Sequence, residues 1–145
     1  MKEFEQSLNK MLVETFEKIV NFEQTSMRDA LGADVTLAEV HLIEALGTQP
    51  NKQATVGRLA QVLNVSAPTV TVAVKRLVAK DCVEKLPCRL DGRQVIVRLT
   101  EEGKRIERTH RILHKLMIRE VCREFAPDER VVLLRLLDTL NRFFA

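Results

Sequence analysis

Residues 64–77 read NVSAPTVTVAVKRL and predict one helix with two different faces. Ser66 is a favourable N-cap, and Pro68 fits the first helical turn because it lacks an N–H group. We therefore expect the Ser66 hydroxyl to accept a hydrogen bond from the N–H of Thr69. The inward face is formed by apolar residues at helical spacing, namely Val70, Val74 and Leu77.

The outward face of the same helix combines hydroxyls, methyl groups and two cations, with no carboxylate. It consists of Thr69, Thr71, Val72, Lys75 and Arg76. Such a surface suits a partner that presents methyl groups, hydrogen-bonding edges and phosphates, which is the chemistry of duplex DNA. The two cations are suited to phosphates or to a guanine edge.

The segment before this helix completes a helix-turn-helix. A short helix is predicted from Thr55. It reaches Asn64, a residue type that tolerates a left-handed turn, and leads directly into the helix from Ser66. Two short helices joined by such a tight turn form a helix-turn-helix.

The segment after it predicts a two-stranded hairpin, or wing. Asp91-Gly92 is a hairpin turn signal, and residues 94–100 alternate with Val95, Val97 and Leu99 on one face. Pro87 restricts the preceding strand to a sheet edge, because proline cannot donate to a strand ladder.

Long amphipathic segments flank the winged region. One helix is predicted over roughly the first 30 residues, and a second begins at Thr36, where Glu39 completes a capping box. Thr100 begins another helix that stops before Pro127, and Pro127 starts the last one. The predicted fold class is mainly α with a small β-hairpin wing, a winged helix-turn-helix flanked by N- and C-terminal dimerisation helices.

We assign residues 1–145 to a single domain, with dimerisation helices at 1–35 and 101–145 and the winged-helix DNA-binding region at 36–100. The flanking helices hold more apolar surface than a small winged helix can cover, and exposed patches of that size indicate association. We therefore expect a two-fold homodimer that presents two recognition helices to a pseudo-palindromic double-stranded DNA site.

Composition narrows the classes of function. The 145 residues are 46% hydrophobic, enough to bury a core, and residues 66–100 hold seven Lys and Arg against three Asp and Glu. There is no signal peptide or long uncharged apolar run, so we expect a cytoplasmic protein with no membrane partner. The three cysteines, without zinc-finger spacing, fit a reducing compartment. No phosphate-binding glycine loop or hydrolase motif occurs, which predicts that the chain is not an enzyme.

Two motifs carry a family resemblance. Residues 58–86, RLAQVLNVSAPTVTVAVKRLVAKDCVEKL, and residues 91–106, DGRQVIVRLTEEGKRI, resemble the MarR family of dimeric winged-helix transcription regulators. By this resemblance the helix from Ser66 enters the major groove, and Arg93 reaches the adjacent minor groove with Asp91 orienting it. The implied DNA-binding residues are Ser66, Thr69, Thr71, Val72, Lys75, Arg76, Asp91 and Arg93.

Two positions depart from the family pattern. Val72 stands where many members have Arg, which implies an altered base preference. Asp81 replaces a usual Gly, which implies a strained turn before the wing. The chain is expected to be a sequence-specific repressor. The alternative from another class is a helical interaction scaffold that does not bind DNA, which would not need Arg93 at a hairpin tip.

One candidate effector is a lipid. Residues 39–47, 66–74 and 110–117 resemble the fatty-acid-biosynthesis repressors of the MarR family, which respond to acyl chains on acyl carrier protein. An acyl chain needs an apolar tunnel. Its candidate lining is Leu12, Phe16, Leu42, Leu46, Leu113 and Met117, residues that could equally form core.

Another candidate effector is zinc. His110 and His114 are spaced i, i+4, which suits chelation from one helix face. With Glu23 and His41 they resemble the ligands of the zinc-responsive branch of the family, whose second site has no counterpart here. The fatty-acid branch has a similar Glu/His pattern, so these residues do not discriminate between lipid and metal. Oxidation of Cys88, beside Arg89, is a third possibility.

Overall fold

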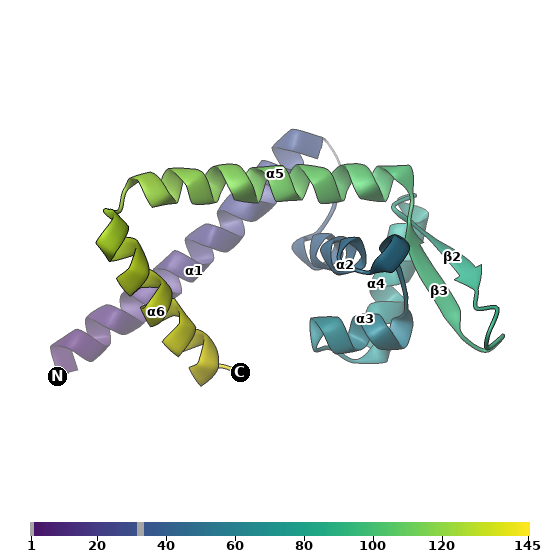
Figure 1. Cartoon of the computed structure of the whole chain (residues 1–145), viewed down its shortest axis with the longest axis horizontal. Coiled ribbons are helices and arrows are strands. Elements are labelled where there is room, and N and C mark those ends of the chain that lie inside the picture. The colour runs from purple at the N-terminus through teal and green to yellow at the C-terminus, as the bar shows by residue number, and fades with distance from the viewer. Residues whose placement is uncertain (1, 32–33) are drawn as a thin grey trace. The chain divides into compact units, whose positions relative to one another are not determined.

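The computed structural model describes residues 2–31 and 34–145. The elements follow in the order α1 (Lys2–Leu31), α2 (Leu37–Gly47), the 3-10 helix η1 (Pro50–Lys52), β1 (Gln53–Thr55), α3 (Val56–Leu63), α4 (Ala67–Ala79), β2 (Val83–Pro87), β3 (Val95–Leu99), α5 (Glu101–Arg123) and α6 (Pro127–Phe143). The chain divides into two compact units, Met1–His110 and Arg111–Ala145. In the first unit α2, α3 and α4 lie together beside the β2–β3 hairpin (Figure 1). The mainly helical winged-helix class is confirmed.

The core of the first unit lies among α2, α3, α4 and the sheet. Its fully buried side chains include Leu42, Ile43, Leu46, Leu59, Val70, Val74, Leu77, Leu99 and Ile106. Burying a side chain of this size stabilises the fold by about 1.5–3 kcal/mol. The apolar stripe predicted for the helix after Ser66 therefore does form the inward side of α4.

Two residues define the turn between α3 and α4. Asn64 follows α3 in the left-handed conformation, with φ 53° and ψ 46°. The N–H of Val65 donates to the carbonyl of Ala60 at 3.1 Å, and the N–H of Asn64 donates to that of Gln61 at 3.2 Å. This pair of bonds closes the helix end, and the chain then enters α4 at a bend of 110°.

The wing is a three-stranded antiparallel sheet in the order β1-β3-β2. The prediction of two strands was therefore incomplete. β1 has only three residues, and its Gln53 pairs with Arg98 of β3. No local sequence pattern predicts this pairing, because Arg98 is far along the chain. Pro87 does end an edge strand, as predicted.

The hairpin loop is longer than a tight turn. Asp91 and Gly92 lie inside a loop of residues 88–94. At the base of this loop, the N–H of Cys88 donates to the carbonyl of Gln94 at 3.1 Å. On β3, Val97 and Leu99 face the core, whereas Val95, predicted on the same face, is 40% exposed. Val95 lies next to the loop, beyond the part of the sheet that the helices cover.

A second left-handed residue lies between α4 and the wing. Asp81 has φ 56°. The N–H of Cys82 donates to the carbonyl of Leu77 at 2.9 Å, and the N–H of Asp81 donates to that of Val78 at 3.0 Å. A non-glycine residue in this conformation carries a cost of about 1–2 kcal/mol. The strained turn predicted at Asp81 is therefore confirmed.

The second unit contains the end of α5 and all of α6. Every residue of α6 is described, and each is half-buried or exposed in the isolated chain. Among the described residues, no single helix has the length and hydrophobicity of a membrane span. Only the bent pair α3 and α4 reaches that combination when taken together, by length and composition alone.

Candidate nucleic-acid interface

The hydroxyl groups on α4 organise the helix itself. Ser66 Oγ accepts the N–H of Thr69 at 3.3 Å, as predicted, and lies 2.7 Å from Thr69 Oγ1. The Thr71 hydroxyl donates to the carbonyl of Ala67 at 3.0 Å. All three side chains belong to exposed residues. Because the hydroxyl of Thr71 is already engaged, its methyl group is the part most available to a thymine methyl.

The cations of α4 are exposed and available. Within residues 2–31 and 34–145, neither Lys75 nor Arg76 has a side-chain ion pair, and both are exposed, as is Val72 between them and Thr71. By contrast, Lys80 at the end of α4 is paired with Glu39 at 2.7 Å. The outward face therefore offers two uncompensated positive charges to a polyanion.

A hollow on the surface brings the recognition helix and the wing together. It is lined by Thr55, Val56, Gly57, Thr71, Arg93, Gln94 and Val95. The N–H of Arg93 donates to Asp91 Oδ1 at 3.0 Å, which supports the predicted orienting role of Asp91. Thr71 and Arg93, predicted from separate motifs, thus face the same concavity.

The start of α3 was missed as part of this surface. A side chain at Gly57 would meet no atom within 4 Å, so the first turn of α3 is open to a partner. Thr55 caps that turn by accepting the N–H of Arg58 at 3.1 Å. The sequence predicted a helix from Thr55, but a cap determines only where a helix begins and not that its first turn lies beside Thr71 and Arg93.

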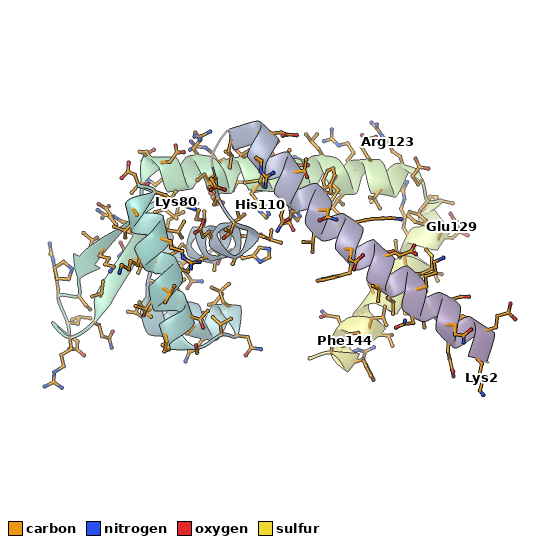
Figure 2. All side chains as sticks on the ribbon, turned by 180° about the vertical axis from the view of Figure 1, so that it is seen from behind. Lys2, Lys80, His110, Arg123, Glu129 and Phe144 are labelled. Carbon is orange, nitrogen blue, oxygen red and sulfur yellow. The ribbon has the colours of Figure 1, made fainter. Side chains whose placement is uncertain are left out.

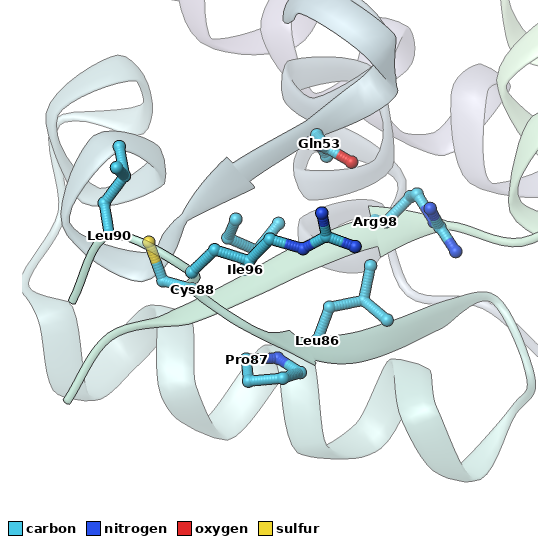
Figure 3. Close-up of a pocket in the computed structure, with 8 residues that line it drawn as sticks. Gln53, Leu86, Pro87, Cys88, Leu90, Ile96 and Arg98 are labelled. Atoms are coloured by element: carbon cyan, nitrogen blue, oxygen red, sulfur yellow. The ribbon is translucent and has the colours of Figure 1, made fainter. Parts of the chain in front are cut away.

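Figure 3 shows a different hollow, on the outer face of the wing. It is lined by Gln53, Leu86, Pro87, Cys88, Arg89, Leu90, Ile96 and Arg98. None of the residues predicted to bind DNA is among them. Arg98 is also engaged, because its Nη2 lies 2.7 Å from Glu84 Oε1. The residues predicted to bind DNA therefore lie outside this hollow.

In the first unit, the carboxylate of Glu23 lies close to two of the other predicted metal ligands, His41 and His110. His110, labelled in Figure 2, is 3% exposed, and its Nε2 lies 2.7 Å from Glu23 Oε1. His41 Nε2 lies 3.9 Å from the same oxygen. Glu44, which sequence reasoning missed, has Oε2 3.9 Å from His110 Nδ1. Its position three residues after His41 was the available signal. His114 follows four residues later on α5 and belongs to the second unit.

The predicted acyl-chain residues fall into different environments. Leu42 and Leu46 are fully buried in the core of the first unit. Leu12 and Phe16 are 39% and 69% exposed on α1. Leu113 and Met117 are half-buried in the second unit. A common tunnel for these residues stays a prediction.

The three cysteines are free thiols. Cys82 is buried, and burial raises the pKa of its thiol above its ordinary value, with the nearby carboxylates of Glu102 and Glu39 acting in the same direction. A neutral, buried thiol is a poor nucleophile. Cys88 and Cys122 are half-buried.

Comparison with known proteins identifies the family. A model of the MarR family matches residues 33–94. The transcriptional regulator AdcR of Streptococcus pneumoniae is 31% identical over 109 residues, which are 73% of this chain and 73% of AdcR.

Solved structures of DNA complexes have the same fold. Streptococcus pneumoniae FabT in complex with DNA matches with a TM-score of 0.89 at 27% identity, over 96% of each chain. A mutant MarR from E. coli complexed with operator DNA matches with a TM-score of 0.74 at 25% identity, over 92% of this chain and 93% of that one. The chain therefore belongs to the MarR family and is a DNA-binding transcriptional regulator rather than an enzyme.

Proposed function

We propose that this regulator is a homodimeric repressor of fatty-acid biosynthesis whose DNA affinity responds to acyl chains on acyl carrier protein. Each copy inserts α4 into the major groove of a pseudo-palindromic operator and Arg93 into the adjacent minor groove. The observation that best supports this docking is the hollow shared by Thr71 and Arg93, because it places helix and wing on one surface.

Homodimerisation is supported by apolar side chains that the single chain leaves exposed. On α1, Phe4 and Phe16 are each 69% exposed, and on α6 so are Val131 and Leu134. Large exposed apolar residues on several helices favour association, and a second copy is the usual partner in symmetric regulators.

The lipid effector is supported by the resemblance of residues 39–47, 66–74 and 110–117 to the fatty-acid-biosynthesis repressors. Leu12 and Phe16 offer exposed apolar surface that an acyl chain can cover. Arg108 and Arg119 on α5 are exposed cations suited to an acidic carrier protein, whereas Arg105 is paired with Glu102 at 2.6 Å.

Native mass spectrometry together with fluorescence anisotropy tests this proposal. The untagged protein is expected to be a dimer that gains a fatty-acyl mass from acyl carrier protein, with a changed affinity for an operator selected from random duplexes. Carrier protein without an acyl chain is the control, and it should change neither the mass of the dimer nor its affinity for the operator. A monomer would contradict the proposed homodimer. A dimer that responds to neither form of the carrier protein would contradict the proposed lipid effector.

A second candidate effector is zinc, supported by the 2.7 Å approach of Glu23 to the buried His110. One carboxylate and two imidazoles, from Glu23, His41 and His110, form a donor set that zinc accepts in proteins. A bound ion would link α1, α2 and α5 and so connect a dimerisation helix to the winged region.

The same mass measurement, made without chelator, tests the zinc candidate. Zinc-sized adducts that disappear in His110→Ala would support it, and His114→Ala tests the fourth residue of the predicted set. Protein that remains free of metal after incubation with zinc would leave Glu23 and His110 as a structural pair.

A further inference from the structure

Glu39 carries a buried carboxylate that is only half satisfied. The residue is 2% exposed, and its Oε2 accepts the N–H of Thr36 at 3.1 Å and Lys80 Nζ at 2.7 Å. Lys80 also donates to the carbonyl of Asp34 at 2.5 Å. Within the described part of the chain, Glu39 Oε1 is buried and has no hydrogen-bond partner. A buried anionic oxygen without a donor is unfavourable, so a donor for Oε1 is required.

Glu39 borders a hollow that opens onto the recognition helix. From α2 it is lined by Thr36, Ala38 and Glu39, and from α4 by Pro68, Thr69, Val72, Ala73 and Arg76. Thr69 Oγ1 already lies 2.7 Å from Ser66 Oγ, and Thr36 Oγ1 already accepts the N–H of Glu39. Arg76 is the one lining side chain with a charge opposite to that of Glu39, and its guanidinium carries five N–H donors.

We propose that Glu39 is a positioning residue for Arg76 in DNA recognition. In the DNA complex, Arg76 turns into the hollow that it lines with Glu39. Glu39 Oε1 then accepts an N–H from one edge of the guanidinium, and the other edge is left for O6 and N7 of a guanine. A guanidinium that is hydrogen-bonded to a carboxylate is fixed in one orientation. A guanidinium without that bond can also turn to phosphates, which carry no sequence information. This inference rests on the proposed placement of α4 in the major groove.

A purely structural role for Glu39 predicts a different result. Lys80, labelled in Figure 2, follows α4, and its ion pair with Glu39 also anchors the end of α4 to α2. Loss of that anchor would weaken binding to all duplexes alike. Loss of the positioning contact would weaken discrimination at one base pair, so selectivity separates the two roles.

The experiment measures binding to a duplex selected by the wild type and to its single-base variants, by fluorescence anisotropy at one salt concentration. Glu39→Gln, Arg76→Ala and the double variant form a cycle, and Lys80→Met removes the anchor alone. Gln has one acceptor oxygen, which Thr36 and Lys80 occupy. Arg76→Ala is expected to lower discrimination about tenfold at one base pair. Glu39→Gln should lower discrimination at that base pair by about fivefold, and it should have no further effect in the Arg76→Ala background. Lys80→Met should preserve the discrimination.

Two results overturn the inference in distinguishable ways. If Arg76→Ala loses discrimination and Glu39→Gln keeps it, Arg76 reads DNA without Glu39, and the placement of α4 stands. If Arg76→Ala changes no base preference, the inference fails. A uniform loss of affinity on all duplexes would then assign Arg76 to a phosphate and leave the placement of α4 standing, whereas an unchanged affinity would count against that placement. Arg76→Lys provides a check that leaves Glu39 untouched. It keeps the charge and should lose discrimination as Arg76→Ala does, whereas full discrimination by Lys would refute a positioned guanidinium.

Discussion

Asp91 and Arg93 are joined across the wing loop by a hydrogen bond of 3.0 Å from the N–H of Arg93 to the carboxylate of Asp91. Arg93 also lines the hollow to which Thr71 contributes. Arg93→Ala is expected to weaken operator binding by about 1–3 kcal/mol, because a cation suited to the minor groove is lost. Anisotropy titration at fixed salt measures this loss.

Arg89→Ala is the matched control for Arg93, because it removes an equal charge from the same loop. Arg89 lines the hollow on the outer face of the wing, away from Thr71. We expect a clearly smaller loss of affinity from this substitution. Equal losses in both variants would show that the wing acts through its total charge and not through a placed side chain.

Lys75→Ala is expected to weaken binding on all sequences. Lys75 is exposed and has no ion-pair partner among the described residues, so its ammonium group is available to a phosphate. Loss of one phosphate contact should flatten the plot of log affinity against log salt by about one unit. A loss confined to particular sequences, with the salt slope unchanged, would assign Lys75 to base reading instead.

Leu134→Asp is expected to separate the dimer. Leu134 is 69% exposed on α6, and in a symmetric dimer each of two copies would forfeit about 1.5–3 kcal/mol of apolar burial. Analytical ultracentrifugation at micromolar concentration should show monomers. Leu90→Asp is the control, because Leu90 is 99% exposed on the wing and should leave the dimer intact. A dimer that persists in Leu134→Asp would place the interface elsewhere.

Alkaline pH should destabilise the fold through Cys82. Burial raises the pKa of this thiol in the folded state, so at alkaline pH the unfolded chain loses a proton that the folded chain retains. Folding stability therefore falls as pH rises through this range. Thermal melts between neutral pH and pH 10 should show a steeper decline for the wild type than for Cys82→Ala. Parallel declines would mean that other groups control alkaline unfolding.

The helices and their ends follow from the sequence because their signals are local. Ser66 and Thr36 cap their helices through groups three residues away, and Asn64 and Asp81 occupy the left-handed positions that end α3 and α4. The outward residues of α4 were likewise predictable, since helical spacing alone separates them from its apolar stripe. These features need no knowledge of distant parts of the chain.

Contacts between distant segments depended on the tertiary structure. β1 exists only because Gln53–Thr55 meets β3, and the buried carboxylate of Glu39 has a cationic partner only because Lys80 reaches it from the end of α4. At Gly103, a Cβ would overlap the carbonyl oxygen of Cys82, a restriction that nothing near Gly103 in sequence reveals. Such relationships arise when packing of the core brings remote groups into contact. Local sequence therefore determined the elements and their faces, whereas packing determined which side chains meet.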